Sequence, residues 1–386
     1  MSKGPLVLVV MIDALGHRLV RENAFLHGLV GESRPVRTVF GYSSSAIPSL
    51  FTGADPSQHG HFAMYRRDGE GSLFREDRWL IRILGQWLGR KGYMQRSVSA
   101  RLKRRGITGY FSLYEIPPGL LTEFDLCQRR NLFRPGAIDG HPSVFDDLAE
   151  RGIPHRVWDW SVPEERGMEE AREAVREGRA RFLLYYTAAM DGMMHVHGTR
   201  SGPTREKLRQ LDGFIRDLVA AGEHRYDGVR LFVFGDHGMA DVVAEHDLWS
   251  KLPPPGPPGR RGVLYFLDST LARFWFDDPE RRRPIEDLLA GESYGRCLTV
   301  EEEKGLGVHF PDRRYGELMF VAKEGHCLVP SFMGRESVAG MHGYHPDDPD
   351  SYTTLLTNTG VPAPDDVRGL ARILKDEVLA LGRGGA

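Results

Sequence analysis

Cysteine is scarce in this chain of 386 residues, which contains only three: Cys127, Cys297 and Cys327. They lie far apart in the sequence, and an odd number cannot pair completely. Neither a disulfide framework nor a cysteine-based zinc site is therefore indicated. We expect all three to be free thiols.

The chain also lacks a charge excess and long apolar runs. Lysine and arginine together number 51 against 53 aspartates and glutamates, a net charge of −2, which argues against general nucleic-acid binding. No apolar run approaches the roughly 20 residues of a transmembrane segment. The first apolar run leads directly into Asp13, so cleavage of a signal peptide after it would remove that residue. We therefore expect a cytoplasmic protein.

The chain does contain three apolar runs that end at aspartate. Hydrophobic residues make up 41% of the chain, enough for a large core. Continuous apolar runs of strand length are typical of parallel strands buried on both faces. We predict an α/β fold with a central, mostly parallel sheet flanked by helices. The runs are Leu6 to Ile12 before Asp13, Phe182 to Met190 before Asp191, and Arg230 to Phe234 before Gly235-Asp236.

The carboxylates after these strands are predicted to converge. Ligands of open α/β sheets bind outside the carboxyl ends of the strands, so Asp13, Asp191 and Asp236 would share one site. His195 and His237 would accompany them. Carboxylates that close repel one another unless cations lie between them. Each aspartate alone could cap a turn, but three with attached histidines favour a metal centre.

A run of small hydroxyl residues, Ser43-Ser44-Ser45, precedes a short helical pattern that ends near Thr52-Gly53. The N-terminus of a helix offers free backbone N–H groups and a dipole that favour a phosphate or sulfate oxygen. One serine could act there as a nucleophile. The same residues also fit an ordinary N-cap and turn, and spacing alone does not separate these interpretations.

A basic segment interrupts the α/β pattern after residue 65. From Arg66 to Arg105 there are twelve arginines and lysines against four acidic residues. We interpret residues 66–136 as an amphipathic cap or lid insertion whose basic face is solvated, holds an anionic substrate, or lies on a membrane surface. If the face with Trp79 and Trp87 is exposed, it would suit a homodimer contact. The apolar residues at helical spacing are Trp79, Leu80, Ile83, Leu84, Trp87 and Leu88.

A second segment, residues 252–335, is predicted to be a small α+β insertion. It begins with a Pro/Gly-rich loop and continues with paired strands near 263–267 and 272–276, a helix and a further strand near 317–322. The α/β catalytic core is then formed by residues 1–65, 137–251 and 336–386. This core includes a crossover helix over 204–221 and a C-terminal amphipathic helix over about 365–381.

The order of these motifs resembles the alkaline phosphatase superfamily and, within it, the nucleotide pyrophosphatase/phosphodiesterase family. The motifs that carry the resemblance are Asp13, the serine run before Thr52-Gly53, Asp191 with His195, Asp236-His237, and His342-Gly343-Tyr344. The resemblance implies an alkaline-phosphatase-like fold and a two-zinc phosphoester hydrolase. It assigns one zinc to Asp191, His195 and His342, and the other to Asp13, Asp236, His237 and the nucleophile.

Several assignments stay open within this resemblance. The family offset from Gly53 puts the nucleophile at Ser43, but the usual Thr-x-Pro pattern is absent, so Ser44 and Ser45 are alternatives. His197 is an alternative to His195. The asparagine that the family uses for a phosphoryl oxygen is expected about four residues after Gly60. Residues 64–66 are Met64, Tyr65 and Arg66, so either Tyr65 or Arg66 is predicted to supply this contact.

The residues and the resemblance together predict a mechanism. Coordination to zinc would lower the pKa of the Ser43 hydroxyl without a general base, and the Ser44 backbone N–H would bind a non-bridging oxygen. A phospho-Ser43 intermediate would form and then be hydrolysed. We predict a phosphodiesterase or nucleotide pyrophosphatase that acts on a small anionic phosphoester. Manganese or iron could occupy the same ligands.

Two other functions compete with this prediction. A phosphomonoesterase or phosphonate hydrolase could use the same site, because arginines of the basic insertion would favour a doubly charged phosphate. A non-catalytic scaffold could retain the metals for stability alone. The completeness of the ligand set argues against the scaffold.

Overall fold

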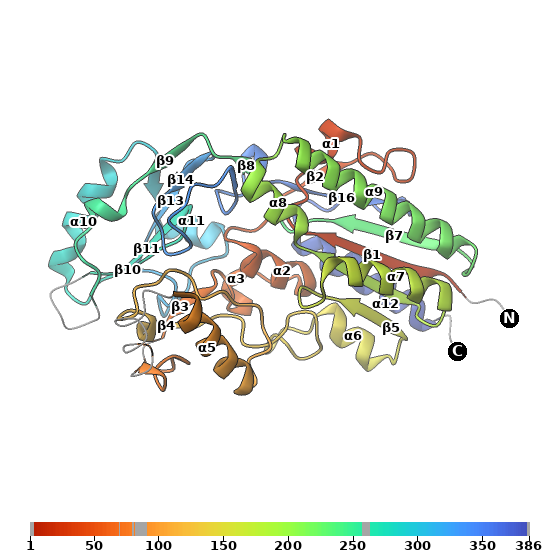
Figure 1. Cartoon of the computed structure of the whole chain (residues 1–386), viewed down its shortest axis with the longest axis horizontal. Helices are drawn as coiled ribbons and strands as arrows, with labels where there is room; N and C mark the ends of the chain where they lie inside the picture. Colours follow the sequence, from red (N-terminus) through yellow and green to blue (C-terminus); the bar gives the residue numbers. More distant parts are fainter. Residues whose placement is uncertain (1–3, 69, 79–80, 82–90, 257–262, 384–386) are drawn as a thin grey trace.

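A six-stranded sheet forms the centre of the structure, a computed structural model that describes residues 4–68, 70–78, 81, 91–256 and 263–383 (Figure 1). Neighbouring strands β7, β1, β6 and β5 are parallel, whereas β16 runs antiparallel to both β7 and β2. The predicted α/β fold with a mostly parallel central sheet is confirmed. The antiparallel pairings lie at one edge, where β16 pairs with β7 and β2. In sheet order, the strands are β2 (Arg34–Val36), β16 (Thr353–Thr357), β7 (Val229–Phe234), β1 (Leu6–Ile12), β6 (Phe182–Thr187) and β5 (His155–Trp158).

Two layers of helices cover the sheet because successive strand residues point to opposite faces. In β1, Leu8 and Val10 belong to one hydrophobic core, and Val7 and Val9 belong to the other. The first core includes α1 (His17–Asn23), α7 (Glu164–Glu177), α8 (Ala189–His197) and α9 (Gly202–Glu223). The second includes α2 (Ser43–Thr52), α6 (Val144–Glu150) and α12 (Arg368–Arg383). Among the described residues, no helix is long and apolar enough to cross a membrane.

The two helices predicted for the core are confirmed, but one strand boundary is wrong. The crossover helix is α9, which leads back to β7, and the C-terminal helix is α12. The strand predicted to continue to Met190 stops at Thr187, and α8 begins at Ala189. Asp191 therefore lies in the first turn of a helix. Its spacing of four residues from His195 puts both side chains on one face of α8.

A smaller antiparallel sheet lies at the opposite end of the molecule from the two chain termini (Figure 1). The predicted paired strands are β10 (Leu264–Leu267) and β11 (Leu271–Trp275), and the predicted later strand is β13 (Leu318–Ala322). The predicted helix is α10 (Arg282–Ala290), preceded by a short 3-10 turn. β12 (Gly295–Cys297) completes this sheet. The domain boundaries drawn from the sequence stay a prediction.

The segment interpreted as a basic insertion contains both a helix and a strand pair. Helix α5 (Lys91–Arg104) buries Val98 and Leu102. Strand β3 (Tyr65–Arg67) pairs antiparallel with β4 (Phe124–Leu126). The six apolar residues predicted to form an amphipathic face, and with them the homodimer contact at Trp79 and Trp87, lie outside the described residues.

Strand β16 was not predicted from the sequence, although it helps to hold the site. Its only apolar residues are Leu355 and Leu356, too few for a recognisable strand pattern. Its position depends on pairing with β7 and β2, which are remote in sequence. Thr353 Oγ accepts a hydrogen bond from the Gly235 N–H (3.1 Å) and donates one to the Leu15 carbonyl (3.0 Å). Through this side chain, β16 forms hydrogen bonds with both the loop that follows β7 and the loop that follows β1.

Short elements complete the described chain. They lie in the connections between the larger elements, and several flank the residues described below. They are α3 (Pro56–His59), α11 (Val300–Gly305), and the strand pairs β8 (Ala240–Asp241) with β15 (Gly340–Met341) and β9 (Ala244–His246) with β14 (His326–Leu328).

Candidate active site

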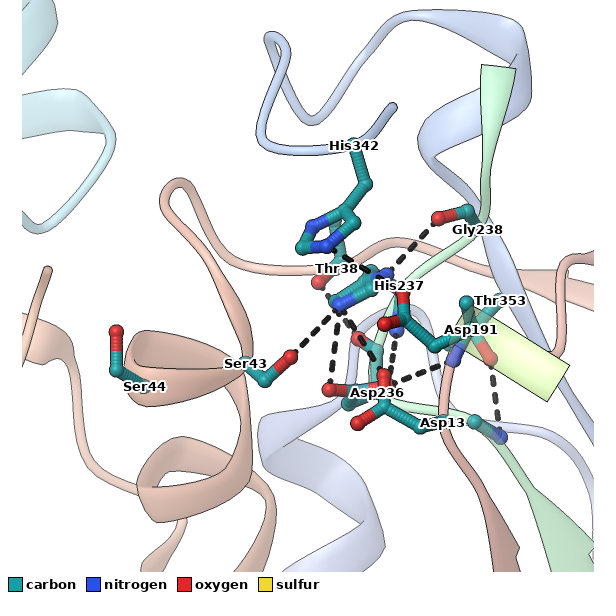
Figure 2. Close-up of polar contacts among 12 residues, drawn as sticks. Asp13, Thr38, Ser43, Ser44, Asp191, Asp236, His237, Gly238, His342 and Thr353 are labelled. Atoms are coloured by element: carbon teal, nitrogen blue, oxygen red, sulfur yellow. Dashed lines mark hydrogen bonds and ion pairs between the residues drawn. The ribbon is translucent and has the colours of Figure 1, made fainter. Parts of the chain in front are cut away.

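The side chains that follow β1, β6 and β7 meet at the carboxyl edge of the central sheet (Figure 2). Asp13 directly follows β1, Asp236 lies two residues after β7, and Asp191 lies in the first turn of α8. The structure thus brings together the three carboxylates that the sequence predicts to converge. Three histidines approach them from separate segments: His195, His237 and His342.

One group of candidate metal ligands consists of Asp191, His195 and His342, whose ligand atoms all lie within 4.8 Å of one another. Asp191 Oδ1 is 3.3 Å from His195 Nε2 and 3.4 Å from His342 Nε2. His195 Nδ1 donates a hydrogen bond to the Gly340 carbonyl at 2.8 Å. A carbonyl can only accept, so Nδ1 carries a proton and Nε2 is the ring atom that faces Asp191 and is placed to bind a metal.

The second group surrounds His237. Its Nε2 atom lies 3.5 Å from Asp13 Oδ1 and 3.3 Å from Asp236 Oδ2. Its Nδ1 atom donates to the Gly238 carbonyl at 2.9 Å, which again leaves Nε2 free as a ligand. Ser43 Oγ lies 3.0 Å from the same Nε2, and Figure 2 shows its side chain directed at His237. The second predicted ligand set is therefore gathered around one atom.

The site holds buried polar atoms without hydrogen-bond partners among the described residues. These include one oxygen from each of the three carboxylates: Asp13 Oδ1, Asp191 Oδ1 and Asp236 Oδ2. Burial raises the pKa of Asp13 well above its usual range, and the charges of Asp236 and Asp191 raise it further. Such an arrangement is unfavourable for the protein alone, because buried carboxylates need a partner. Cations bound between these oxygens would balance their charge and remove the unfavourable free energy of burying them.

The donor set fits a dinuclear metal centre. Carboxylate oxygens and imidazole nitrogens together suit zinc, and also manganese or iron. Burial and the neighbouring His237 hold the pKa of His342 well below its ordinary value, which keeps that ring in the neutral form that a metal ligand needs. The cluster can therefore hold metal, and its ligand types do not select a single element.

The three consecutive serines at the start of α2 have different surroundings. Ser43 faces His237, whereas the Ser44 side chain points away from the cluster in Figure 2 and donates to the Phe62 carbonyl at 3.3 Å. Ser45 is fully buried and donates to the Phe40 carbonyl at 2.8 Å. Of the three hydroxyls, only that of Ser43 adjoins the candidate metal ligands. Ser44 still lines the adjacent cavity.

Tyr65 and Arg66, for which phosphate contacts were predicted, do not line the cavity beside the cluster. The Tyr65 hydroxyl donates to the Ser112 carbonyl at 2.8 Å. Arg66 Nη2 lies 3.1 Å from Asp125 Oδ2. The partner of Tyr65 is 47 residues away in sequence and that of Arg66, on β4, is 59 residues away, so short-range motif offsets do not reveal these contacts.

The other histidines near the motifs take no part in the cluster. His197, the alternative to His195, is exposed on α8. His345 lies 3.6 Å from Asp347. The buried His59 shares a hydrogen bond with Ser49 Oγ at 2.9 Å. Among the described histidines, only the three predicted ligands lie next to the carboxylates of Asp13, Asp191 and Asp236.

A cavity of about 300 Å³ opens beside the cluster. It is bordered by Ser43 and Asp191 and extends toward residues that the sequence did not identify as functional. These residues come from separate segments, so no local motif connects them. Of the described residues that line it, none is lysine or arginine. Its aromatic lining consists of Tyr42, Tyr110, Tyr114, Phe133, Trp160 and Tyr186.

Tyr186 orients one of the candidate metal ligands. Its hydroxyl donates to Asp13 Oδ2 at 2.5 Å, which leaves Oδ1 directed at His237. We expect Tyr186→Phe to weaken zinc binding by about 10-fold, because such supporting hydrogen bonds hold a ligand in place. Competition with a chromogenic chelator measures this change. Tyr185→Phe is the matched control, since the Tyr185 hydroxyl donates to the Glu164 carbonyl, at 3.4 Å, and not to a candidate metal ligand. Equal zinc affinities of the two variants would contradict the assigned role.

The sheet, the Asp/His cluster and the serine at a helix start together define a hydrolase of the alkaline phosphatase superfamily. The chain belongs to the Type I phosphodiesterase / nucleotide pyrophosphatase family, whose model it matches over residues 7–345. It is therefore an enzyme, a phosphodiesterase or pyrophosphatase that hydrolyses phosphoester bonds, and not a scaffold without catalysis.

Comparison with solved structures agrees with this fold. Murine ectonucleotide pyrophosphatase/phosphodiesterase 5 superimposes with a TM-score of 0.67 and the human protein with 0.68. Each is 14% identical to this chain, and the match covers 97% of this chain and 95% of the other. An inactive variant of the murine protein in complex with AMP gives a TM-score of 0.67. No curated protein matches the sequence.

Proposed function

We propose that this protein is a two-zinc phosphodiesterase in which Ser43 attacks a small anionic phosphoester. The observation that carries the proposal is the position of Ser43 Oγ, 3.0 Å from His237 Nε2 at the first residue of α2. Oxygens of Asp13 and Asp236 lie 3.5 and 3.3 Å from the same nitrogen. A hydroxyl surrounded in this way is suited to activation as a nucleophile.

In this proposal the two zinc ions have separate ligand sets. Asp191, His195 and His342 would hold one zinc, and Asp13, Asp236, His237 and Ser43 would hold the other, with manganese or iron as alternatives. When bound, the cations would favour the ionised Ser43 hydroxyl and balance negative charge on the phosphoryl oxygens.

The residues of the chain would perform two displacements. In the first, Ser43 Oγ gives up its proton and forms a bond to phosphorus while the bond to the leaving oxygen breaks and that oxygen takes up a proton, giving a phosphoryl-Ser43 ester that keeps the other ester group of the substrate. In the second, water replaces Ser43 and restores its hydroxyl. The backbone N–H of Ser44, in the first turn of α2, would donate to a non-bridging oxygen in both steps, because this N–H has no partner within the helix.

The lining of the cavity favours a diester over a monoester. A monoester carries one more negative charge than a diester, and no described lining residue is a lysine or arginine that would balance it. Two basic residues of the described part of the insertion pair with a buried aspartate of the same segment. Arg101 Nε lies 2.7 Å from Asp77, and Arg105 Nη1 lies 3.2 Å from it. No described arginine of the insertion lines the cavity beside the cluster.

The aromatic side chains of the cavity further suit a planar leaving group. Tyr110 and Trp160 are in edge-to-face contact, with ring centroids 5.4 Å apart. Aromatic side chains stack on nucleobases without requiring a particular sequence. The AMP complex of the murine relative is consistent with a nucleotide-like substrate for this chain. A cytoplasmic location stays a prediction.

Zinc-loaded protein is expected to prefer bis-p-nitrophenyl phosphate over p-nitrophenyl phosphate by at least about 10-fold in kcat/KM, which corresponds to about 1.4 kcal/mol of transition-state stabilisation. The reason is the absence of a described cationic side chain for the second charge of the monoester. Steady-state kinetics of the two substrates at equal pH and salt measure the ratio. A preference for the monoester would instead establish the phosphomonoesterase alternative.

A further inference from the structure

Thr187, the last residue of β6, forms hydrogen bonds with segments that carry both groups of candidate metal ligands. Its backbone carbonyl accepts from the Asp13 N–H at 2.9 Å. Its side-chain Oγ1 accepts from the Ala189 N–H at 3.1 Å, in the first turn of α8. Asp13 belongs to the ligand group around His237, whereas α8 supplies Asp191 to the other group. The position of Thr187 therefore affects how the two groups are placed relative to each other.

Helix α8 begins without a polar side chain at its N-cap position. That position is Ala188, which makes no side-chain capping hydrogen bond. The first N–H groups of a helix have no acceptor within the helix, so another group has to accept from them. Thr187 Oγ1, one residue before the N-cap, is such an acceptor for Ala189. The Thr187 hydroxyl thus helps to fix the first turn of α8, where Asp191 follows Ala189 by two residues.

A glutamate of α7 determines the direction of the Thr187 hydroxyl. Thr187 Oγ1 donates to Glu164 Oε1 at 2.6 Å. A hydroxyl has a single proton, so this bond leaves the lone pairs of Oγ1 to accept from the Ala189 N–H. Glu164 Oε2 lies 2.6 Å from Nζ of Lys207 on α9, and the two side chains are only 22% and 14% exposed. Removing either partner would leave a largely buried charge uncompensated, so each holds the other in place.

We propose that Thr187, held by the Glu164–Lys207 ion pair, is a positioning residue that sets the relative placement of the two metal sites. The proposal rests on the proposed function, which uses two metals. A two-metal site clamps the attacking and leaving oxygens of an in-line displacement, so its two halves have to be correctly spaced. Small displacements of reacting groups lower a rate strongly. A shift of α8 relative to Asp13 would therefore lower turnover even when both sites hold zinc.

The first test compares zinc binding by wild-type protein, Thr187→Val and Thr187→Ser. Valine keeps the shape of threonine but cannot accept from the Ala189 N–H or donate to Glu164. We expect the more weakly bound equivalent of zinc to lose about 10-fold in affinity, because the group that supports its ligands is gone. Serine keeps the hydroxyl and should retain the wild-type affinity. Competition with a chromogenic chelator measures the affinities. Wild-type affinity in Thr187→Val, or an equal loss in Thr187→Ser, would overturn the proposal.

Kinetics at saturating zinc separate positioning from a contribution to stability alone. Under these conditions Thr187→Val should lower kcat for bis-p-nitrophenyl phosphate by at least about 10-fold. KM should change little, since Thr187 does not line the cavity. Denaturant titration of the metal-free protein gives the free energy of unfolding of the same variants. If Thr187→Val lowered this free energy but left zinc affinity and kcat at their wild-type values, the positioning role would be refuted.

Glu164→Gln tests the ion pair separately and replaces Thr187→Val if that variant does not fold. A glutamine has only one acceptor oxygen, so it cannot accept from both Thr187 and Lys207. We expect zinc affinity to fall as it does in Thr187→Val. Glu206→Gln is the matched control, because it makes the same change in an exposed ion pair of α9, where Glu206 lies 2.6 Å from Arg209. Equal zinc affinities of the two glutamine variants would overturn the role of Glu164.

Zinc binding is measured without substrate, so this proposal can fail independently of the proposed function. If Ser43→Ala abolished turnover while Thr187→Val left zinc affinity and kcat intact, the role of Thr187 alone would be overturned. Wild-type protein that binds fewer than two equivalents of zinc would overturn both proposals.

Discussion

Replacing Ser43 with alanine is expected to lower kcat/KM for bis-p-nitrophenyl phosphate by at least about 1,000-fold. The hydroxyl of Ser43 lies 3.0 Å from His237 Nε2, whereas the hydroxyls of the next two serines donate to backbone carbonyls. Without Ser43 Oγ there is no side chain in this position to form the covalent intermediate. Steady-state kinetics of zinc-loaded protein measure the loss.

Ser44→Ala and Ser45→Ala are the matched controls, because they remove the same atom from adjacent positions. We expect both variants to retain most of the activity. Ser45→Ala should lower the free energy of unfolding by about 1 kcal/mol through the loss of one buried hydrogen bond, measured by denaturant titration. If Ser44→Ala or Ser45→Ala abolished turnover while Ser43→Ala did not, the nucleophile would be misassigned. Mass spectrometry of protein quenched during turnover of bis-p-nitrophenyl phosphate should find a p-nitrophenyl phosphoryl group on the peptide that contains Ser43.

The parts of the fold predicted well are those with a strong local pattern. β1 and β7 are uninterrupted apolar runs, and α9 has an apolar face at helical spacing, so each could be recognised alone. β16 has only Leu355 and Leu356 as apolar residues and becomes a strand through pairing with β7 and β2. The end of β6 was misplaced because the apolar residues continue into the first turn of α8.

The same distinction applies to the candidate site. The carboxylates and histidines could be predicted to meet because the carboxyl ends of parallel strands share one edge. Tyr186 has no such signal, since its role depends on a hydrogen bond to Asp13, which is remote in sequence. The ion pair of Arg66 could not be predicted for the same reason. Its partner, Asp125, is brought near by the pairing of β3 with β4.

His195→Ala and His197→Ala provide a sharp test of the metal centre, because the two histidines are on the same helix only two residues apart. His195 Nε2 lies 3.3 Å from Asp191 Oδ1, and its Nδ1 is fixed by the Gly340 carbonyl. His197 is exposed. We expect wild-type protein and His197→Ala to bind about two equivalents of zinc, and His195→Ala about one. Elemental analysis after dialysis against a weak chelator measures the content.

Thermal and chemical unfolding give a second measurement that does not depend on turnover. Zinc at 100 times its dissociation constant should add about 2.7 kcal/mol per site to the free energy of unfolding, because it relieves the repulsion among Asp13, Asp191 and Asp236. We expect His195→Ala to lose about half of the zinc-dependent increase and His197→Ala to keep it. If both variants retained the full zinc content and the full increase, His195 would not be a ligand. If both variants lost the same share of the zinc-dependent increase in the free energy of unfolding, the loss would come from perturbing α8 and not from removing a ligand.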